Sequence, residues 1–148
     1  MNEYPVWWET TLTVFNKHQD AQTQVITWTK TAIPNCFWKD VGEKISVGDV
    51  VLETDNIICR IPKDDKFLES SEWSAKPNDV RGNYFTLQQG DIIVRGAVTD
   101  VINEYSSGHR STDLLKKYKN LQGCMTIQKV GINIGKGRCN EHYYVKGI

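Results

Sequence analysis

The sequence predicts a mainly β protein, a small, partly open barrel or sandwich of about seven or eight short strands with one late α-helix. Short runs rich in Val, Ile and Thr are separated by turn-forming residues along most of the chain, as at residues 10–15 and 23–30. Helical periodicity is confined to residues 113–121. Because helices do not alternate with strands, a doubly wound α/β fold is excluded.

Two Gly-Asp pairs precede aliphatic runs in this pattern. Gly90-Asp91 stands before residues 92–94, and Gly48-Asp49 stands before residues 50–52. Glycine accepts a positive φ and aspartate can bond neighbouring amides, so each pair predicts a tight turn that opens a strand. We expect both strands in one β core. The side chains expected to be mostly buried there are those of Val51, Ile58, Ile92 and Val94.

The other expected strands follow from the same alternation of runs and turns. Pro34 is expected at the start of a strand, where its missing N–H does no harm. Gly96 is expected to form a bulge or sharp bend after the central strand. The expected strands outside the two Gly-Asp segments are 10–15, 23–30, 35–38, 57–61, 124–130 and 142–146.

The one expected helix covers residues 113–121 and is capped by Ser111 or Thr112. Leu114, Leu115 and Tyr118 share a face, so we expect them to pack against the barrel. Leu121 is expected on the same face. The remaining positions are expected to face solvent or a neighbouring subunit. They include Lys116, Lys117 and Lys119.

Residues 62–84 have neither strand nor helix periodicity and predict one long loop. Loops of this length within a domain are usually functional. The alternative is an ordinary solvated loop. In either case Phe67, Leu68 and Trp73 are candidates to anchor the loop to the barrel.

Charge and composition narrow the function classes. Lys plus Arg and Asp plus Glu both total 18, so the formal net charge is zero. A protein that coats nucleic acid needs a basic face, so the neutral charge argues against that class of protein. A neutral subunit has little self-repulsion when it assembles with its copies. The N-terminal residues do not resemble a signal peptide, and no apolar run is long enough for a membrane span. The four cysteines are therefore expected to be reduced, mostly buried thiols in a cytosolic protein: Cys36, Cys59, Cys124 and Cys139.

The sequence predicts no enzyme and no cofactor. His18, His109 and His142 are far apart, and no nucleophile or metalloprotease motif is present. Cys139 and His142 have the spacing of metal ligands, but a second close pair is missing, so structural cysteines are favoured over a metal site. The Gly135–Gly137 segment lacks phosphate-loop spacing and predicts a hairpin turn.

Residues 1–9 are expected to form an extended N-terminal arm ending near Trp7 and Trp8. Tryptophans fill cores but also anchor protein–protein interfaces. For Trp7 and Trp8, a place in the core and a place at an interface are equally favoured.

Six motifs spread over nearly the whole 148-residue domain support a resemblance to a known family. They are PVWW at 5–8, NCFW at 35–38, ICRIP at 58–62, GDIIVRG at 90–96, SGHRSTDLL at 107–115 and EHYYVKG at 141–147. With them the chain resembles head–tail joining (neck) proteins encoded by tailed bacteriophages and prophages. Among these it is most similar to the head-closure (stopper) proteins, which are small SH3-like β-barrels with a long loop or hairpin directed into the channel of a ring.

The resemblance implies a structural virion protein without catalytic residues. Such a protein forms a homo-oligomeric ring, expected to be a dodecamer, between the portal–adaptor complex and the tail. It helps to retain packaged DNA, which passes through without sequence-specific binding, and its partners are the portal, the adaptor, and tail terminator or tail tube proteins. It would assemble in the host bacterial cytoplasm and reside in the neck of the virion, without membrane contact.

The resemblance also implies where function resides. The 62–84 loop is expected to line the channel or contact a partner, and the charge balance of its first residues suits a channel that must not hold DNA. Trp7, Trp8 and Lys117 are expected at a subunit interface. The residues assigned to the channel or partner loop are Lys63, Asp64, Asp65, Lys66, Phe67, Glu72 and Trp73.

Two alternatives stay open. Within the same gene block, the chain is a tail terminator or a minor capsid protein. In another class, it is a small β-barrel enzyme or ligand-binding module, which would need polar residues converging in one pocket. The sequence spacing gives no sign of such a pocket.

Overall fold

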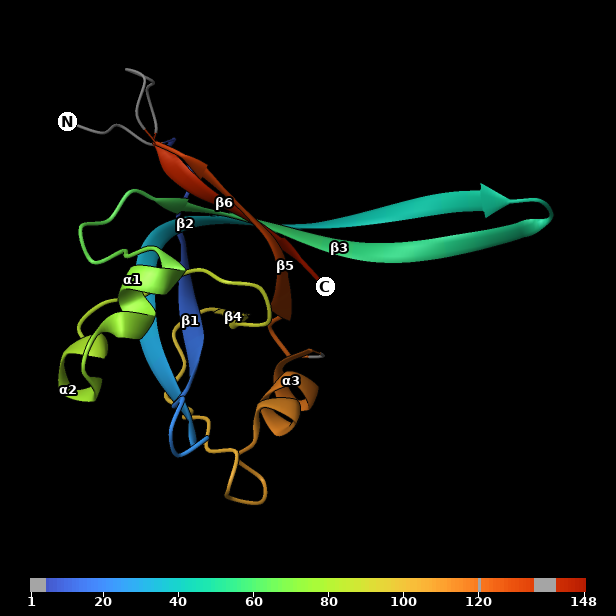
Figure 1. Ribbon diagram of the computed structural model, residues 1–148. Coiled ribbons are helices and arrows are strands. Elements are labelled where there is room, and N and C mark those ends of the chain that lie inside the picture. Colours follow the sequence, from blue (N-terminus) through green and yellow to red (C-terminus); the bar gives the residue numbers. More distant parts are fainter. Residues whose placement is uncertain (1–4, 120, 135–140) are drawn as a thin grey trace.

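The computed structural model describes residues 5–119, 121–134 and 141–148, with the backbone alone for residues 41–47 and 50–55 (Figure 1). The described residues form six antiparallel strands that close into a barrel in the order β1-β2-β3-β6-β5-β4. This confirms the mainly β barrel with a late helix. The elements are β1 (Thr10–Gln19), β2 (Ile26–Val47), β3 (Val50–Pro62), α1 (Ser70–Ala75), α2 (Asn78–Arg81), β4 (Ile92–Arg95), α3 (Ser111–Lys119), β5 (Cys124–Asn133) and β6 (His142–Gly147).

A bulge at Pro34-Asn35 turns β2 from one side of the barrel to the other. The first part of β2 pairs with β1 and the second part pairs with β3. Asn35 has a φ of 59°, and the β1–β2 register shifts opposite this point. The expectation that Pro34 begins a separate strand is therefore wrong. The expected strands 23–30 and 35–38 are parts of one bent strand, because a bulge bends a strand without ending it.

The larger core cluster fills the barrel with side chains that alternate along the strands. Ile93 belongs to this cluster and is fully buried. Its neighbours Ile92 and Val94 are also buried, as expected, but they belong to the second cluster, beneath α3. Ile58 is only half-buried, and the side chain of Val51 lies outside the described residues. The strand residues of the larger cluster are Leu12, Val14, Ile33, Cys36, Trp38, Cys59, Ile61, Ile93, Met125, Ile127, Tyr143 and Val145.

Helix α3 covers the outer face of the barrel in the expected orientation, but the expectation for Leu121 is wrong: this residue follows the helix and is 68% exposed. Leu114 and Tyr118 are each 5% exposed and pack with Phe15, Ile92 and Val94. Leu115 lies partly buried at the edge of this contact. The helix thus adds a second apolar layer outside the sheet, which is how a mostly polar helix is held in place.

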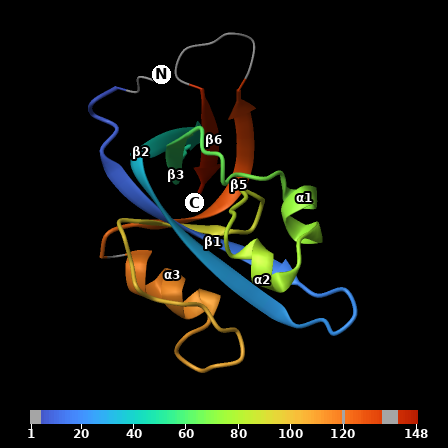
Figure 2. The ribbon, with the colours of Figure 1, turned by 90° about the vertical axis from the view of Figure 1, so that its left-hand side faces the viewer.

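Residues 62–84 form an ordered cover, so the expectation of a structureless loop is wrong. Helices α1 and α2 lie in this segment, on a different side of the barrel from α3 (Figure 2). A parallel bridge joins Phe67 to Phe85, and Trp73 is completely buried with its ring 6.0 Å from that of His18 in β1.

Arg81 ties the two short helices together. Arg81 is 5% exposed, and its guanidinium donates to Asn78 Oδ1 and to the Lys76 carbonyl at 2.6 Å each and lies 5.5 Å from the Trp73 ring. Buried cations are stable only with such hydrogen-bond partners, so Arg81 fixes the geometry of this cover.

Candidate functional site

Strands β2 and β3 leave the barrel together as a long two-stranded hairpin (Figure 1). The pairing of β3 with β6 ends at Ile57, whereas the β2–β3 ladder continues from the Val41–Asn56 pair to the Val47–Val50 pair. Within the described part of the chain, no third strand pairs with this extension. We call residues 41–56 the arm. At about 3.3 Å per residue it reaches roughly 20 Å beyond the barrel.

A tight turn at Gly48-Asp49 closes the arm. Gly48 has a φ of +62°, a conformation that glycine adopts without strain. The turn itself was expected, but the strand after it runs along the arm before it reaches the barrel. A two-residue turn flanked by long extended runs is a strong hairpin signal, and it could have revealed the arm.

The arm is acidic. Its sequence contains Glu43, Asp49, Glu53 and Asp55 but only one basic residue, Lys44, which gives a formal charge of −3 from four acidic residues and one basic residue. Since the whole chain is neutral, the remaining residues sum to +3. An arm of this charge repels nucleic acid phosphates and attracts a basic protein surface.

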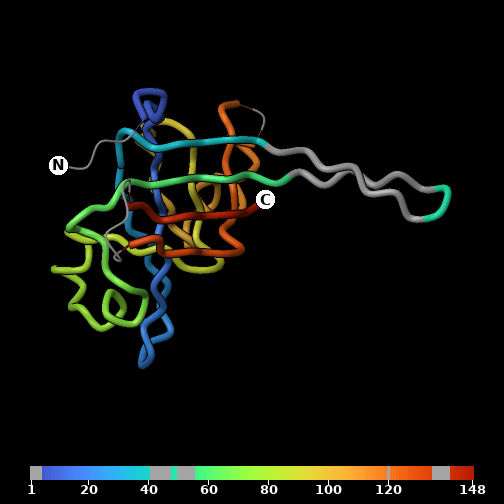
Figure 3. Tube along the Cα trace, turned by 90° about the horizontal axis from the view of Figure 1, so that it is seen from above, coloured from blue at the N-terminus to red at the C-terminus, as the bar shows by residue number. Residues whose placement is uncertain are grey.

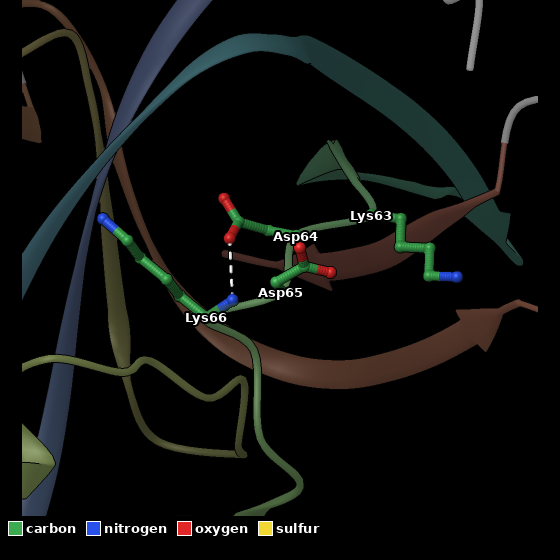
Figure 4. A pocket seen from close by; sticks show the side chains of 4 residues that line it. All are labelled: Lys63, Asp64, Asp65 and Lys66. Atoms are coloured by element: carbon green, nitrogen blue, oxygen red, sulfur yellow. Dashed lines mark hydrogen bonds between the residues drawn. The ribbon is translucent and has the colours of Figure 1, made fainter. Parts of the chain in front are cut away.

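The first charged residues of the 62–84 segment surround an open hollow of about 530 Å³ (Figure 4). The structure therefore brings Lys63, Asp64, Asp65 and Lys66 together, as their adjacency predicts. The Asp64 carboxylate accepts a 2.8 Å bond from the Lys66 backbone N–H, which holds the turn. Two positive and two negative side chains offer a polar contact surface at this hollow.

Of the other residues assigned to this segment, one lies on the surface and two pack against the barrel. Glu72 is exposed on α1, whereas Trp73 is buried. The Phe67 ring stacks on that of Tyr143 at 4.1 Å and lies 5.7 Å from that of Phe85. The two aromatic residues anchor the cover to the barrel, so they are not free to reach a channel or partner.

The two N-terminal tryptophans have different environments. Trp8 is 6% exposed and packs near Phe37 and His142, at ring distances of 6.2 and 5.6 Å. Trp7 stays 58% exposed, with its ring 5.4 Å from that of Phe37. Trp8 therefore belongs to the body of the protein, and Trp7 is the member of the pair available to a partner.

Lys117, the third residue expected at an interface, is held by its own chain. Its ammonium lies 2.8 Å from the Asp100 carboxylate, which also accepts a 2.6 Å bond from the Tyr118 hydroxyl. The hydrogen bond from Lys117 lowers the pKa of Asp100. Exposed pairs of this kind contribute little to stability.

A buried carboxylate links β1 to the residue just before β4. Asp91 is 1% exposed and accepts bonds from Asn16 Nδ2 at 2.8 Å, the Lys17 N–H at 3.1 Å and Gln88 Nε2 at 3.2 Å. Burial raises the pKa of Asp91 to about 6, although these three donors oppose the shift. With no access to solvent, Asp91 serves the structure and is not placed to meet a substrate.

We expect stability to fall as pH rises through the titration of Asp91. The pKa of Asp91 is higher in the folded state than the usual value of 3.8, so the folded protein binds more protons between about pH 4 and 6. The titration of Asp91 should remove about 2 kcal/mol of unfolding free energy from pH 4 to pH 7. Urea unfolding at both values measures this loss. Asp91→Asn should flatten the slope, whereas replacement of the exposed acid in Asp79→Asn should keep it; an unchanged slope in Asp91→Asn would contradict the assignment.

The cysteines that the structure describes have the environment of inert thiols. Cys36, Cys59 and Cys124 are free and buried, and Cys139 lies outside the described residues. Burial raises the pKa of Cys36 to about 12 and that of Cys59 well above its usual value.

Among the described residues, no three His, Cys, Asp or Glu side chains converge on a possible metal position. The helices of the same residues are all too short or too polar to cross a bilayer.

Comparison with known proteins finds a matching family. A model described as a family of unknown function, DUF6751, matches residues 7–148. No curated protein and no solved structure matches the chain.

Proposed function

The chain belongs to the DUF6751 family of unknown function, and we propose that this member is a head-closure protein of a phage neck. In this role it forms a ring, expected to be a dodecamer, between the portal–adaptor complex and the tail. The ring helps to retain packaged DNA and offers a docking surface to the tail. The resemblance of the six sequence motifs supports the proposal, and the arm is the observation on which it rests.

The arm has the form that a channel element needs. It extends from a closed barrel whose own strands are fully paired, so the barrel supplies a rigid wall and the arm can reach into the ring. Its formal charge of −3 keeps it from binding the DNA that must pass. We therefore assign the channel role to residues 41–56 in place of residues 62–84. The hollow at Lys63–Lys66 remains a candidate contact for the adaptor or the tail.

A tail terminator is the second candidate. Proteins of that kind combine a sheet with two or more helices, and this chain has α1 and α2 as well as α3. Loss of the protein has a different effect on the phage particles in the two cases. Loss of head closure leaves filled heads that leak DNA, whereas loss of a terminator leaves tails of uncontrolled length.

Removing the arm tests the proposal. In the variant, Asn-Gly replaces residues 41–56, so that the Asp40–Ile57 pair closes on a two-residue turn. We expect the barrel to fold with a stability within about 1 kcal/mol of the parent, because the arm adds no strand to it. In a phage that encodes the protein, electron microscopy of lysates should show filled heads that lose DNA or lack tails.

A second hairpin provides the matched control. Replacement of residues 20–25 by Asn-Gly shortens the β1–β2 connection beyond the Gln19–Ile26 pair by the same operation. Particles with that change should infect normally. Normal infection and DNA retention by the variant without the arm would refute the channel role, and overlong tails would assign the protein to tail termination.

A further inference from the structure

The sheet formed by β2, β3, β6 and β5 has an outer face that none of the described helices covers. Figure 3 shows these strands side by side at the root of the arm, with no helix in front of them. Side chains of a strand point alternately to its two faces, so the neighbours of the buried core residues point outwards. The outward residues are Phe37 and Lys39 in β2, Ile58, Arg60 and Pro62 in β3, His142, Tyr144 and Lys146 in β6, and Lys129, Gly131 and Asn133 in β5.

Four of these outward residues are basic and none is acidic. Ile58 pairs with Lys39 on one side and with Lys146 on the other. Lys146 pairs in turn with Lys129, so the three lysines stand in one row across four strands, about 14 Å long at the usual strand spacing. Arg60 stands in the next row. Among the described residues, no acidic side chain forms an ion pair with any of the four.

Aromatic side chains belong to the same surface. The Phe37 ring lies 5.5 Å from the Arg60 guanidinium and 5.4 Å from the Trp7 ring. Trp7 is 58% exposed, and Tyr144, which pairs with Arg60, is half-buried. The cations and the rings therefore form one continuous surface. We call it the basic aromatic face, and it consists of Trp7, Phe37, Lys39, Arg60, Lys129, Tyr144 and Lys146.

The neutral net charge of the chain conceals this face. Because the arm carries a formal charge of −3, the rest of the chain carries +3, and four positive charges lie together on one surface. Positive charge that no neighbouring acid neutralises attracts a polyanion. Nucleic acid is a polyanion that also offers flat bases to aromatic rings, and a single strand leaves those bases free to stack.

We infer that the basic aromatic face binds single-stranded nucleic acid without sequence preference. The four cations contact phosphates, and the exposed ring of Trp7 stacks on a base. The inference goes beyond the proposed function, in which DNA only passes through the channel. It does not depend on a ring, because one subunit holds the whole face.

An acidic protein surface, such as the arm of a second copy, is the other partner that four cations suggest. Lysine is depleted at protein–protein interfaces, and three of the four cations are lysines. Lysine and arginine are in contrast the residues that neutralise the phosphates of a nucleic acid. The composition of the face therefore favours nucleic acid.

Reversal of two charges at the ends of the lysine row tests the inference. The face variant is Lys39→Glu/Lys129→Glu, and both lysines are exposed. Fluorescence anisotropy of a labelled oligothymidylate measures binding by the full chain. For the parent, we expect the dissociation constant to rise about fifty-fold between about 50 and 200 mM salt, because four phosphate contacts on a single strand give a logarithmic slope of about 3. The face variant should bind at least about tenfold more weakly at low salt, with a shallower slope.

Lys116→Glu/Lys119→Glu is the matched control, because it makes the same change of net charge at two exposed lysines on α3. It should bind like the parent. Trp7→Ala tests the stacking and should weaken binding by about fivefold or more, whereas Trp7→Tyr keeps a ring and should restore most of the affinity. Thermal melting checks that each variant folds.

A parent that does not bind the oligonucleotide, or a face variant that binds it no more weakly than the control, would overturn the inference. Equal affinity for the duplex with the complementary strand, together with an unchanged Trp7→Ala, would also overturn it, because bases are then not bound. Sedimentation velocity covers the rival partner. Self-association that the face variant loses, in a parent that binds no oligonucleotide, would assign the face to a contact between subunits.

Discussion

Trp73→Ala is expected to lower the free energy of unfolding by about 3–5 kcal/mol, as removal of a fully buried aromatic side chain does. Trp73 is completely buried in α1, between His18 of β1 and the guanidinium of Arg81. Its loss leaves a cavity and also removes the ring on which Arg81 lies. Urea unfolding of the purified protein measures the change.

Glu72→Ala is the control, because Glu72 is the exposed neighbour in the same short helix. Its stability should stay within about 0.5 kcal/mol of the parent. A Gly-Ser linker in place of residues 63–84 should have a larger effect than Trp73→Ala and prevent folding. This reverses what a structureless loop would predict, since such loops tolerate shortening. A folded barrel in the shortened variant would show that α1 and α2 are dispensable.

Gly147→Ala is expected to cost about 3 kcal/mol or more, at the upper end of what overpacking of a core produces. A β-carbon at Gly147 would lie 2.1 Å from the Thr126 carbonyl oxygen, a backbone atom that cannot rotate away. Strands β5 and β6 would have to separate where Gly147 pairs with Ile127. Thermal or urea unfolding measures this loss.

Gly131→Ala provides the comparison within the same pair of strands. There the nearest atom to a new β-carbon is Tyr144 Cβ at 3.6 Å, an ordinary contact. We expect its stability to change by less than about 1 kcal/mol. Equal losses at Gly131 and Gly147 would show that the effect reflects strand propensity, not the close approach of Thr126.

The sequence was sufficient to predict the extended runs, but not which of them form one continuous strand or which strands are neighbours. The turns at Gly48-Asp49 and Gly90-Asp91 follow from local chemistry, and both glycines have positive φ. Whether a strand has a partner on each side depends on distant residues. Residues 50–52 were therefore expected in the core, although the β3 ladder with β6 starts only at Ile57.

The covering helices were missed for a different reason. Six and four residues are too few to show a helical period, and Trp73 and Arg81 reveal their burial only through contacts with β1 and with each other. The α3 helix was predicted because nine residues display its buried Leu114 and Tyr118 at the expected spacing. Of the candidate site, the adjacent charges at Lys63–Lys66 were predictable, whereas the direction of the arm was not.

The strand order has a consequence for synthesis of the protein. Strands β1, β2 and β3 form a local meander that can pair as soon as residue 62 has left the ribosome, and the arm is part of it. Among the described strands, the other edge of β3 pairs with β6, which follows the other five strands in the sequence, through pairs as distant as Ile57 and Gly147. Until β6 has been synthesised, the nascent chain is an open sheet with an exposed edge, which is prone to pairing with other chains. A stop codon before His142 would make that state permanent.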